Sequence, residues 1–284
     1  MAECRPVTEI HAQAQHQAAP GNDCFRVASG TKGIERLEAS LHGQPFSPHR
    51  HDTYAIGITV SGVQTFRYRG ERWQCLPGQC HILHPDELHD GGAGTEEGFC
   101  YRMLYIDPAL IQEALQGRPL PFVKQAIVDA DLLRANTSPD LWDLDTDLDD
   151  VVSTDLIVAA SNLLLHAAEQ RPERIGSLNL PALLRVKALI SANCAEQHSM
   201  DELEVIAGID RWTLARQFRA AFGTSPRRYR TLRQLDRVRL LLKQGLTLAD
   251  AAMDAGFSDQ SHMTRQFKLA YGLTPKKWLT ALNG

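Results

Sequence analysis

The strongest constraint in this 284-residue chain is an internal repeat near its C-terminal end. Residues 213–229 (TLARQFRAAFGTSPRRY) align with residues 262–278 (HMTRQFKLAYGLTPKKW) at a constant offset of 49. Of the 17 aligned positions, 13 are identical or conservative. The identical pairs are Arg216/Arg265, Gln217/Gln266, Phe218/Phe267, Ala221/Ala270, Gly223/Gly272 and Pro226/Pro275. Such self-similarity indicates that one supersecondary unit occurs twice.

Each copy has the local pattern of two short helices joined by a turn. Helices are expected over residues 200–207 and 248–255, and each ends near a glycine that can adopt a positive φ. A polar residue then caps a second helix, which is Asp210 in the first copy and Ser258 or Asp259 in the second. This is the helix-turn-helix pattern, whose second helix can enter the DNA major groove. Between the copies, residues 226–244 predict a long helix with one buried apolar stripe and arginines on its other faces.

The net charge of −4 conceals an uneven distribution. Residues 181–284 carry 16 Lys and Arg against 9 Asp and Glu, whereas residues 1–180 carry 14 against 25. The two parts therefore have charges of +7 and −11. This asymmetry favours a polyanion-binding module attached to a different domain, over the alternative of a plain helical bundle with a duplicated hairpin.

The last hundred residues resemble the DNA-binding domain of the AraC/XylS family of bacterial transcription regulators. The runs GIDRWTLARQFRAAFGTSPRRY (208–229) and GFSDQSHMTRQFKLAYGLTPKKW (256–278) carry the resemblance. It implies a seven-helix domain whose two helix-turn-helix units read adjacent major-groove segments of double-stranded DNA. The chain departs from the family at Glu204, which corresponds to Ala252, because the family usually has alanine there. A carboxylate at this position must reach solvent or find an arginine.

The candidates for reading bases lie at the start of each second helix. Arginine can chelate guanine, and glutamine can pair with adenine. The predicted DNA-binding residues are Arg211, Trp212, Thr213, Arg216, Gln260, Ser261, His262 and Arg265. The apolar residues of the same helices (Leu214, Phe218, Met263 and Phe267) are predicted to be core.

The N-terminal part predicts a β-domain that is rich in histidine. Residues 24–107 contain short alternating segments at roughly 8–12 residue spacing, which indicates a sandwich or barrel. His49 and His51 share one face of a strand, and His89 returns after a Pro-containing turn, so the three can converge. This arrangement resembles the cupin β-barrel and the sensory domain common at the front of AraC-like regulators.

Three interpretations of these histidines stay open at this point. They contact an organic effector, they hold a divalent metal, or they are structural. Metal-binding cupins place a glutamate shortly after the second histidine, whereas this chain has DTYAIG at 52–57, and Asp52 points away from His51 on a strand. We therefore expect no cofactor and an effector site formed by His49, His51, Tyr54 and His89, with His49, His51 and His89 as the ligands if a metal binds. His81 and His84 have opposite parity and cannot both face the interior.

Other classes of protein have little support in the sequence. The chain shows no Ser-His-Asp elbow, P-loop or G-x-G-x-x-G run, so we expect no enzyme. The six cysteines form no C-x-x-C pair, which favours small buried hydrophobes over redox sensing. No apolar stretch approaches 18 residues and no secretory signal is visible, so a cytoplasmic location is expected.

We therefore predict a two-domain fold: an N-terminal all-β cupin-like barrel (20–150), a helical linker (151–180) and a C-terminal all-α domain (181–284) with two helix-turn-helix units. The predicted protein is a one-component transcription regulator in which a small-molecule effector shifts the disposition of barrel, linker and DNA-binding domain. The resemblance implies an activator that works with RNA polymerase. A homodimer through the helix over 153–170 is predicted from its apolar stripe, although packing on the barrel explains that stripe equally well.

Overall fold

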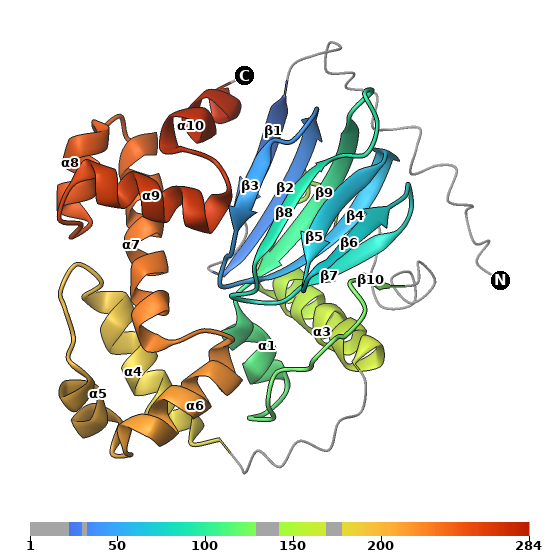
Figure 1. The fold of residues 1–284 in the computed structure, drawn as a ribbon. Helices are drawn as coiled ribbons and strands as arrows, with labels where there is room; N and C mark the ends of the chain where they lie inside the picture. Colours follow the sequence, from blue (N-terminus) through green and yellow to red (C-terminus); the bar gives the residue numbers. More distant parts are fainter. Residues whose placement is uncertain (1–22, 30–32, 129–141, 169–177, 284) are drawn as a thin grey trace.

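The computed structural model of the protein describes residues 23–29, 33–128, 142–168 and 178–283. Strands dominate the chain as far as residue 128, and the chain from residue 178 onward is helical (Figure 1). The expected fold class, an all-β domain followed by an all-helical domain, is confirmed.

The strands form two antiparallel sheets that pack face to face. The larger sheet has the order β1-β2-β9-β4-β7-β10, and the smaller has the order β3-β8-β5-β6. Their bounds are β1 Cys24–Ser29, β2 Ile34–Leu41, β3 Phe46–His49, β4 Tyr54–Gly62, β5 Gln64–Tyr68, β6 Glu71–Cys75, β7 Cys80–Leu83, β8 His89–Ala93, β9 Phe99–Ile106 and β10 Ile127–Val128.

Strand alternation divides the residues of the larger sheet between two cores. Ala55 and Met103 point between the two sheets, where they meet Phe66 of the smaller sheet. Tyr54 and Ile56 point to the opposite side and join a second core. A one-residue shift along a strand therefore moves a side chain from the barrel interior to its outer surface.

Two helices cover the outer surface of the larger sheet. Helix α1 (Pro108–Ala114) begins at Asp107, whose side chain accepts a hydrogen bond from the backbone of Ala109. Helix α3 (Asp150–Ala167) buries Leu156, Leu163 and Leu164 in the same core as Ile56. The apolar stripe of the predicted 153–170 helix thus packs on the barrel as far as Ala167, and residues 169 and 170 lie outside the described residues.

Helix α3 is also long and apolar enough to cross a membrane by length and composition, the single described helix of that kind. In this structure one face of α3 packs against the larger sheet. Its other face exposes Val151, Val158 and Leu165, which recur every seven residues.

The helical domain contains seven described helices, as the resemblance implies. They are α4 Leu180–Ala192, α5 Met200–Ala207, α6 Arg211–Phe222, α7 Pro226–Lys243, α8 Leu248–Asp254, α9 Gln260–Tyr271 and α10 Pro275–Asn283. Asp210 caps α6 and Asp259 caps α9, and Gly208, Gly223 and Gly272 take the left-handed conformation at helix ends.

The two helix-turn-helix units have separate cores that α7 connects. Tyr229 of α7 packs with Phe218 and Leu214 in the first core. Further along α7, Leu235 and Val238 pack with Phe267 in the second core. The core residues predicted in α6, α7 and α9 are all buried.

We predict that α3 contributes to the stability of the barrel through its buried face. Leu163 is fully buried, whereas Leu165, two residues later, is 45% exposed. Leu163→Ala should lower the free energy of unfolding by about 2–5 kcal/mol, because it leaves a cavity in the core. The matched control Leu165→Ala should change it by less than about 0.5 kcal/mol. Urea unfolding followed by circular dichroism measures both, and equal effects would contradict the packing of α3.

Candidate functional site

A cavity of about 410 Å³ lies inside the barrel and extends to the helical domain. Aromatic and aliphatic side chains form its walls within the barrel, among them Phe25, Leu37, Phe46, Phe66 and Met103. Helices α7, α9 and α10 bound its other end with Arg233, Arg239, Tyr271, Trp278 and Leu282. The helical domain therefore forms one wall of the cavity. A volume of this size and an apolar lining are typical of small-molecule sites.

Three predicted histidines meet in the lining of this cavity. His49 of β3 pairs in register with His89 of β8, and His51 follows β3 by two residues. The ring of His89 lies 4.3 Å from that of His49 and 4.8 Å from that of His51, measured between centroids. All three side chains are buried. Burial lowers the pKa of each, to about 4 for His89, so the rings are neutral at pH 7.

Within the described parts of the chain, no group of three or more His, Cys, Asp and Glu side chains is positioned to hold a metal ion. The residue after His51 is Asp52, and its carboxylate turns away toward Arg233 of α7.

A fourth histidine and a glutamine add polar groups to the lining. His81 of β7 is fully buried, and neither of its ring nitrogens has a hydrogen-bond partner among the described residues. The side-chain oxygen of Gln64 is likewise without a partner. A Cβ atom on Gly57 would lie 2.3 Å from the His81 ring, so glycine at 57 leaves room for the imidazole. Unpartnered buried polar atoms are costly, which indicates that a bound molecule or water satisfies them.

Tyr54 is a correction to the predicted effector site. Its hydroxyl donates to the backbone oxygen of Pro121 at 3.0 Å, and its ring lies in the core beneath α3. Tyr54 lies three residues after His51, so alternation puts the two side chains on opposite faces, and Tyr54 faces outward at the start of β4. His84 also lies outside the lining, where its Nε2 accepts from the backbone of Val123.

The cysteines near the barrel show no sign of reactivity. Cys75 and Cys80 are buried free thiols, and burial raises the pKa of both. Burial also raises the pKa of the Cys100 thiol to about 11. Thiols held in the protonated form are poor nucleophiles, which favours a packing role over redox sensing.

The predicted DNA-binding residues lie on the first two turns of α6 and α9. Their backbone is held by the caps, because Asp210 accepts from Thr213 and Asp259 accepts from His262. Thr213 and His262 are half-buried, and the remaining six are exposed: Arg211, Trp212, Arg216, Gln260, Ser261 and Arg265. Trp212 is 76% exposed, so its indole is accessible to a partner.

Glu204, which departs from the family pattern, binds an arginine. Its carboxylate accepts from the backbone of Arg211 at 2.5 Å and from the Arg211 guanidinium at 2.9 Å. Asp201 binds the same guanidinium. The matching residue of the second unit, Ala252, is fully buried. Arg211 is therefore held by two carboxylates in this structure, whereas the second unit has no such restraint at this place.

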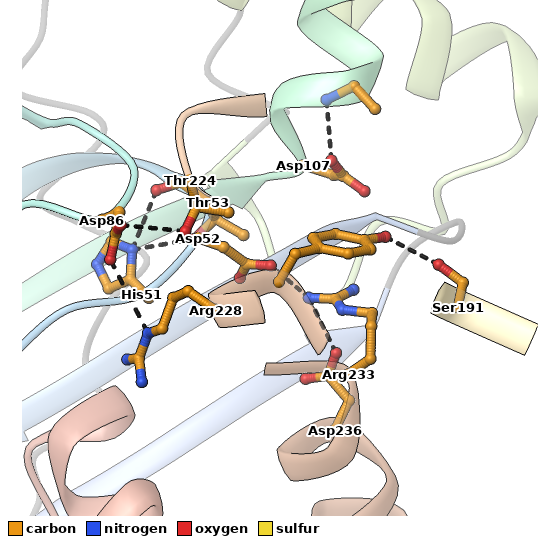
Figure 2. A network of polar contacts seen from close by, with 12 residues as sticks. His51, Asp52, Thr53, Asp86, Asp107, Ser191, Thr224, Arg228, Arg233 and Asp236 are labelled. Atoms are coloured by element: carbon orange, nitrogen blue, oxygen red, sulfur yellow. Dashed lines mark hydrogen bonds and ion pairs between the residues drawn. The ribbon is translucent and has the colours of Figure 1, made fainter. Parts of the chain in front are cut away.

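The barrel and the helical domain are joined by ion pairs that sequence reasoning missed (Figure 2). Arg233 of α7 binds Asp52 at 2.5 Å, and Arg239 of α7 binds Glu35 of β2 at 2.7 Å. Lys187 of α4 binds Asp107 at 3.0 Å. We call this set of contacts, with those of the next paragraph, the barrel–helix interface. The arginines of α7 were visible in the sequence, but their barrel partners carry no local signal.

Further contacts of the barrel–helix interface lie at the C-terminal ends of α6 and α9, the second helices of the two helix-turn-helix units, which we call the recognition helices. Asp86 accepts from Thr224, directly after α6, at 3.0 Å, and Asp86 itself takes a positive φ of 59°. The backbone of Arg50 donates to Leu269 of α9 at 2.9 Å, and Ser47 donates to Gly272. A Cβ atom on Gly272 would lie 2.8 Å from His49, so glycine there permits the close approach.

Asp52 has an unusual ionisation at this interface. Burial raises the pKa of its carboxyl group to about 6, against the opposing effect of Arg233, and Asp236 and Asp107 raise it further. The carboxylate is thus held in a desolvated place by a single strong partner.

The buried histidines predict that the protein loses stability in mild acid. Burial lowers the pKa of five of them, to about 3 for His81 and about 4 for His84 and His89. Between these values and the unfolded value near 6.5, the unfolded chain binds more protons, so stability falls as pH falls. Each pH unit of difference costs about 1.4 kcal/mol per histidine. Asp52 acts in the opposite sense, but it is one group against five.

Thermal unfolding between pH 7.5 and 5 tests this expectation. The melting temperature should fall steadily through this range, and the variant His81→Gln should show a shallower fall. His166→Gln is the matched control, because His166 is exposed on α3 and should leave the slope unchanged. A melting temperature independent of pH would show that the histidines are not held neutral by folding.

Comparison with known proteins places this geometry in a family. A family profile described as the AraC-like ligand binding domain matches residues 31–147, and a helix-turn-helix domain profile matches residues 204–281. The HTH-type transcriptional regulator YbfI of Bacillus subtilis is 26% identical over 232 residues, which cover 78% of this chain and 82% of that protein. The regulator GbdR of Pseudomonas aeruginosa is 35% identical over 88 residues, 31% of this chain and 24% of GbdR.

Solved structures of ToxT from Vibrio cholerae share the two-domain fold. One superposes with a TM-score of 0.62 at 13% identity and covers 89% of this chain and 100% of ToxT. ToxT with a bound unsaturated fatty acid gives a TM-score of 0.59 at 14% identity and covers 94% of this chain and 98% of ToxT. At this identity the likeness shows the fold alone. With a ligand-binding barrel followed by two helix-turn-helix units, the chain belongs to the AraC family of transcription regulators.

Proposed function

We propose that the chain binds specific double-stranded DNA through the first two turns of α6 and α9, and that a small organic effector in the barrel cavity controls this binding. The observation that carries the proposal is the shared lining of the cavity, in which β-strands and helices α7, α9 and α10 take part. A ligand in such a cavity touches both domains, so its affinity depends on how they are docked. By reciprocity, the docking depends on the ligand.

The effect reaches DNA through the ends of the recognition helices. Asp86 contacts the residue after α6, and Ser47 and Arg50 contact the C-terminal end of α9. The barrel therefore fixes the position of one recognition helix relative to the other. Two helices that read adjacent major-groove segments must be about 34 Å apart on one face of DNA, so a change in docking changes the fit.

An organic effector is favoured over a metal or a catalytic role. The cavity walls are largely apolar, and a search of the described residues found no cluster of metal ligands. ToxT, which shares this fold, has been solved with an unsaturated fatty acid bound. We propose that the barrel senses its ligand and performs no chemistry on it, with His49, His51 and His89 as contacts.

The remaining parts of the proposal concern assembly and action. The exposed stripe of Val151, Val158 and Leu165 on α3 supports a homodimer, because a seven-residue apolar repeat can pair with a second helix. We propose that the dimer acts in the cytoplasm as an activator that contacts RNA polymerase, in keeping with its family.

Substitutions on α9 and α10 test the DNA-binding role. Arg265→Ala should weaken binding by about 1–3 kcal/mol and relax the preference for one base of the site. Lys276→Ala is the control for phosphate contact, because Lys276 is exposed on α10. It should weaken binding equally on specific and random DNA and make the salt dependence shallower by about one unit of slope. Gel-shift titrations measure both variants. Equal losses on specific and random DNA for both would contradict the assignment.

Loosening the barrel–helix interface should tighten DNA binding. Glu35→Gln removes the partner of Arg239, which frees the helical domain from one fixed arrangement. We expect the affinity of the effector-free protein for its DNA to rise about fivefold or more. Glu38→Gln is the matched control on the same strand, since Glu38 pairs with Arg102 inside the β-domain. Identical affinities for the two variants would show that the interface does not restrain DNA binding.

A further inference from the structure

The hydrogen-bonding state of the three cavity histidines is fixed by their backbone partners. The Nδ1 atoms of His49, His51 and His89 lie 2.9, 3.0 and 2.9 Å from the backbone oxygens of residues 47, 53 and 87. A carbonyl oxygen only accepts, so each Nδ1 carries the ring proton. Each Nε2 of the neutral ring is left with a lone pair and is an acceptor.

These three acceptors have no partner of their own within the described chain. The hydrogen bonds of the three rings all go through Nδ1, and the side chains line the cavity. The three rings lie within 6.1 Å of one another, measured between centroids. A single polar group among them would therefore face acceptors on several sides.

The charges around the cavity also disfavour an anionic ligand. Two guanidinium groups belong to the described lining, and both are already neutralised by carboxylates. Arg233 is bound by Asp52 and by Asp236, and Arg239 is bound by Glu35. The described lining contains no lysine, and its carboxylates outnumber its arginines. An anionic ligand would have to break an existing ion pair to gain a cation.

The deep end of the cavity continues this pattern. The side-chain oxygen of Gln64 is an acceptor without a partner, and His81 adds two unpartnered ring nitrogens. The intervening walls, which include Phe46, Phe66 and Met103, are apolar. The cavity thus combines an apolar body with unpartnered acceptors at both ends, and the neutral ring of His81 adds one N–H donor beside its one acceptor.

We propose that the effector is a small molecule with an apolar body and a hydrogen-bond-donating head group that carries no negative charge, a hydroxyl or a protonated amine, bound at His49, His51 and His89. The inference rests on the proposed function, since it names the class of ligand for the same cavity. It differs from the carboxylate chemistry of the fatty acid that ToxT binds.

Three probes with identical tails test the head group. Binding of 1-hexanol, hexylammonium and hexanoate to the full-length protein at pH 7.5 is measured by ligand-observed NMR. Hexanol and hexylammonium should bind, and hexanoate should bind at least tenfold more weakly or not at all. His89→Phe keeps a ring of similar size and removes one acceptor, so it should weaken binding of the two favoured probes about tenfold. His166→Phe, on the exposed side of α3, should have no effect.

The comparison of head groups decides the inference even if His89→Phe does not fold. Hexanoate binding as tightly as hexanol, or no binding by any of the three, would overturn it. DNA affinity is measured with and without each probe to separate the two claims. Favoured probes that bind without changing DNA affinity would leave the head-group inference standing and refute the proposed coupling. Hexanoate that binds and changes DNA affinity would refute the head-group inference and support the proposed coupling.

Discussion

The structure depends on a buried electrostatic contact between two domains of opposite charge. Arg233 and Arg239 of α7 are each half-enclosed by the barrel and meet Asp52 and Glu35 there. Buried ion pairs add little net stability, because desolvation offsets the attraction. These pairs are partly buried, so removing one partner leaves a poorly solvated charge and disfavours this docking geometry, at a cost below the about 3–5 kcal/mol of a fully buried pair. The same arginines also lie over the rings of Tyr229 and Trp278, which fixes them further.

The arginines that join the two domains also line one end of the cavity. Because the arginines sit at the cavity end, the groups that hold the domains together are also groups that a ligand meets. Ligand binding and domain docking therefore draw on the same side chains. The coupling needs no relay across the barrel, since the first wall beyond the histidines is already the DNA-binding domain.

Much of the helical domain could be predicted from sequence, because its determinants are local. The repeat, the glycines and the capping aspartates lie within a few residues of the structure they specify. The convergence of His49, His51 and His89 followed from strand parity. Tyr54 was misplaced, because its odd separation from His51 puts it on the outer face of the larger sheet, so parity itself argued against including it. Glu35 could not be found, since its partner lies 204 residues away and no pattern connects them. The sequence did indicate that Glu204 needs an arginine, although not that this arginine would be the predicted base reader Arg211.

The central claim is that the barrel holds the recognition helices through its interface with α7 and α9. Hydrogen exchange at the Arg50 amide tests it most directly, because this amide donates across the interface to Leu269. We predict that the Arg50 amide exchanges slowly in the native protein and at least tenfold faster in the double variant Glu35→Gln/Asp52→Asn. The Ile82 amide, which donates to Ala126 within the barrel, should keep its rate. An Arg50 amide that exchanges like an unfolded peptide in the native protein, or at the same rate in both proteins, would contradict the account.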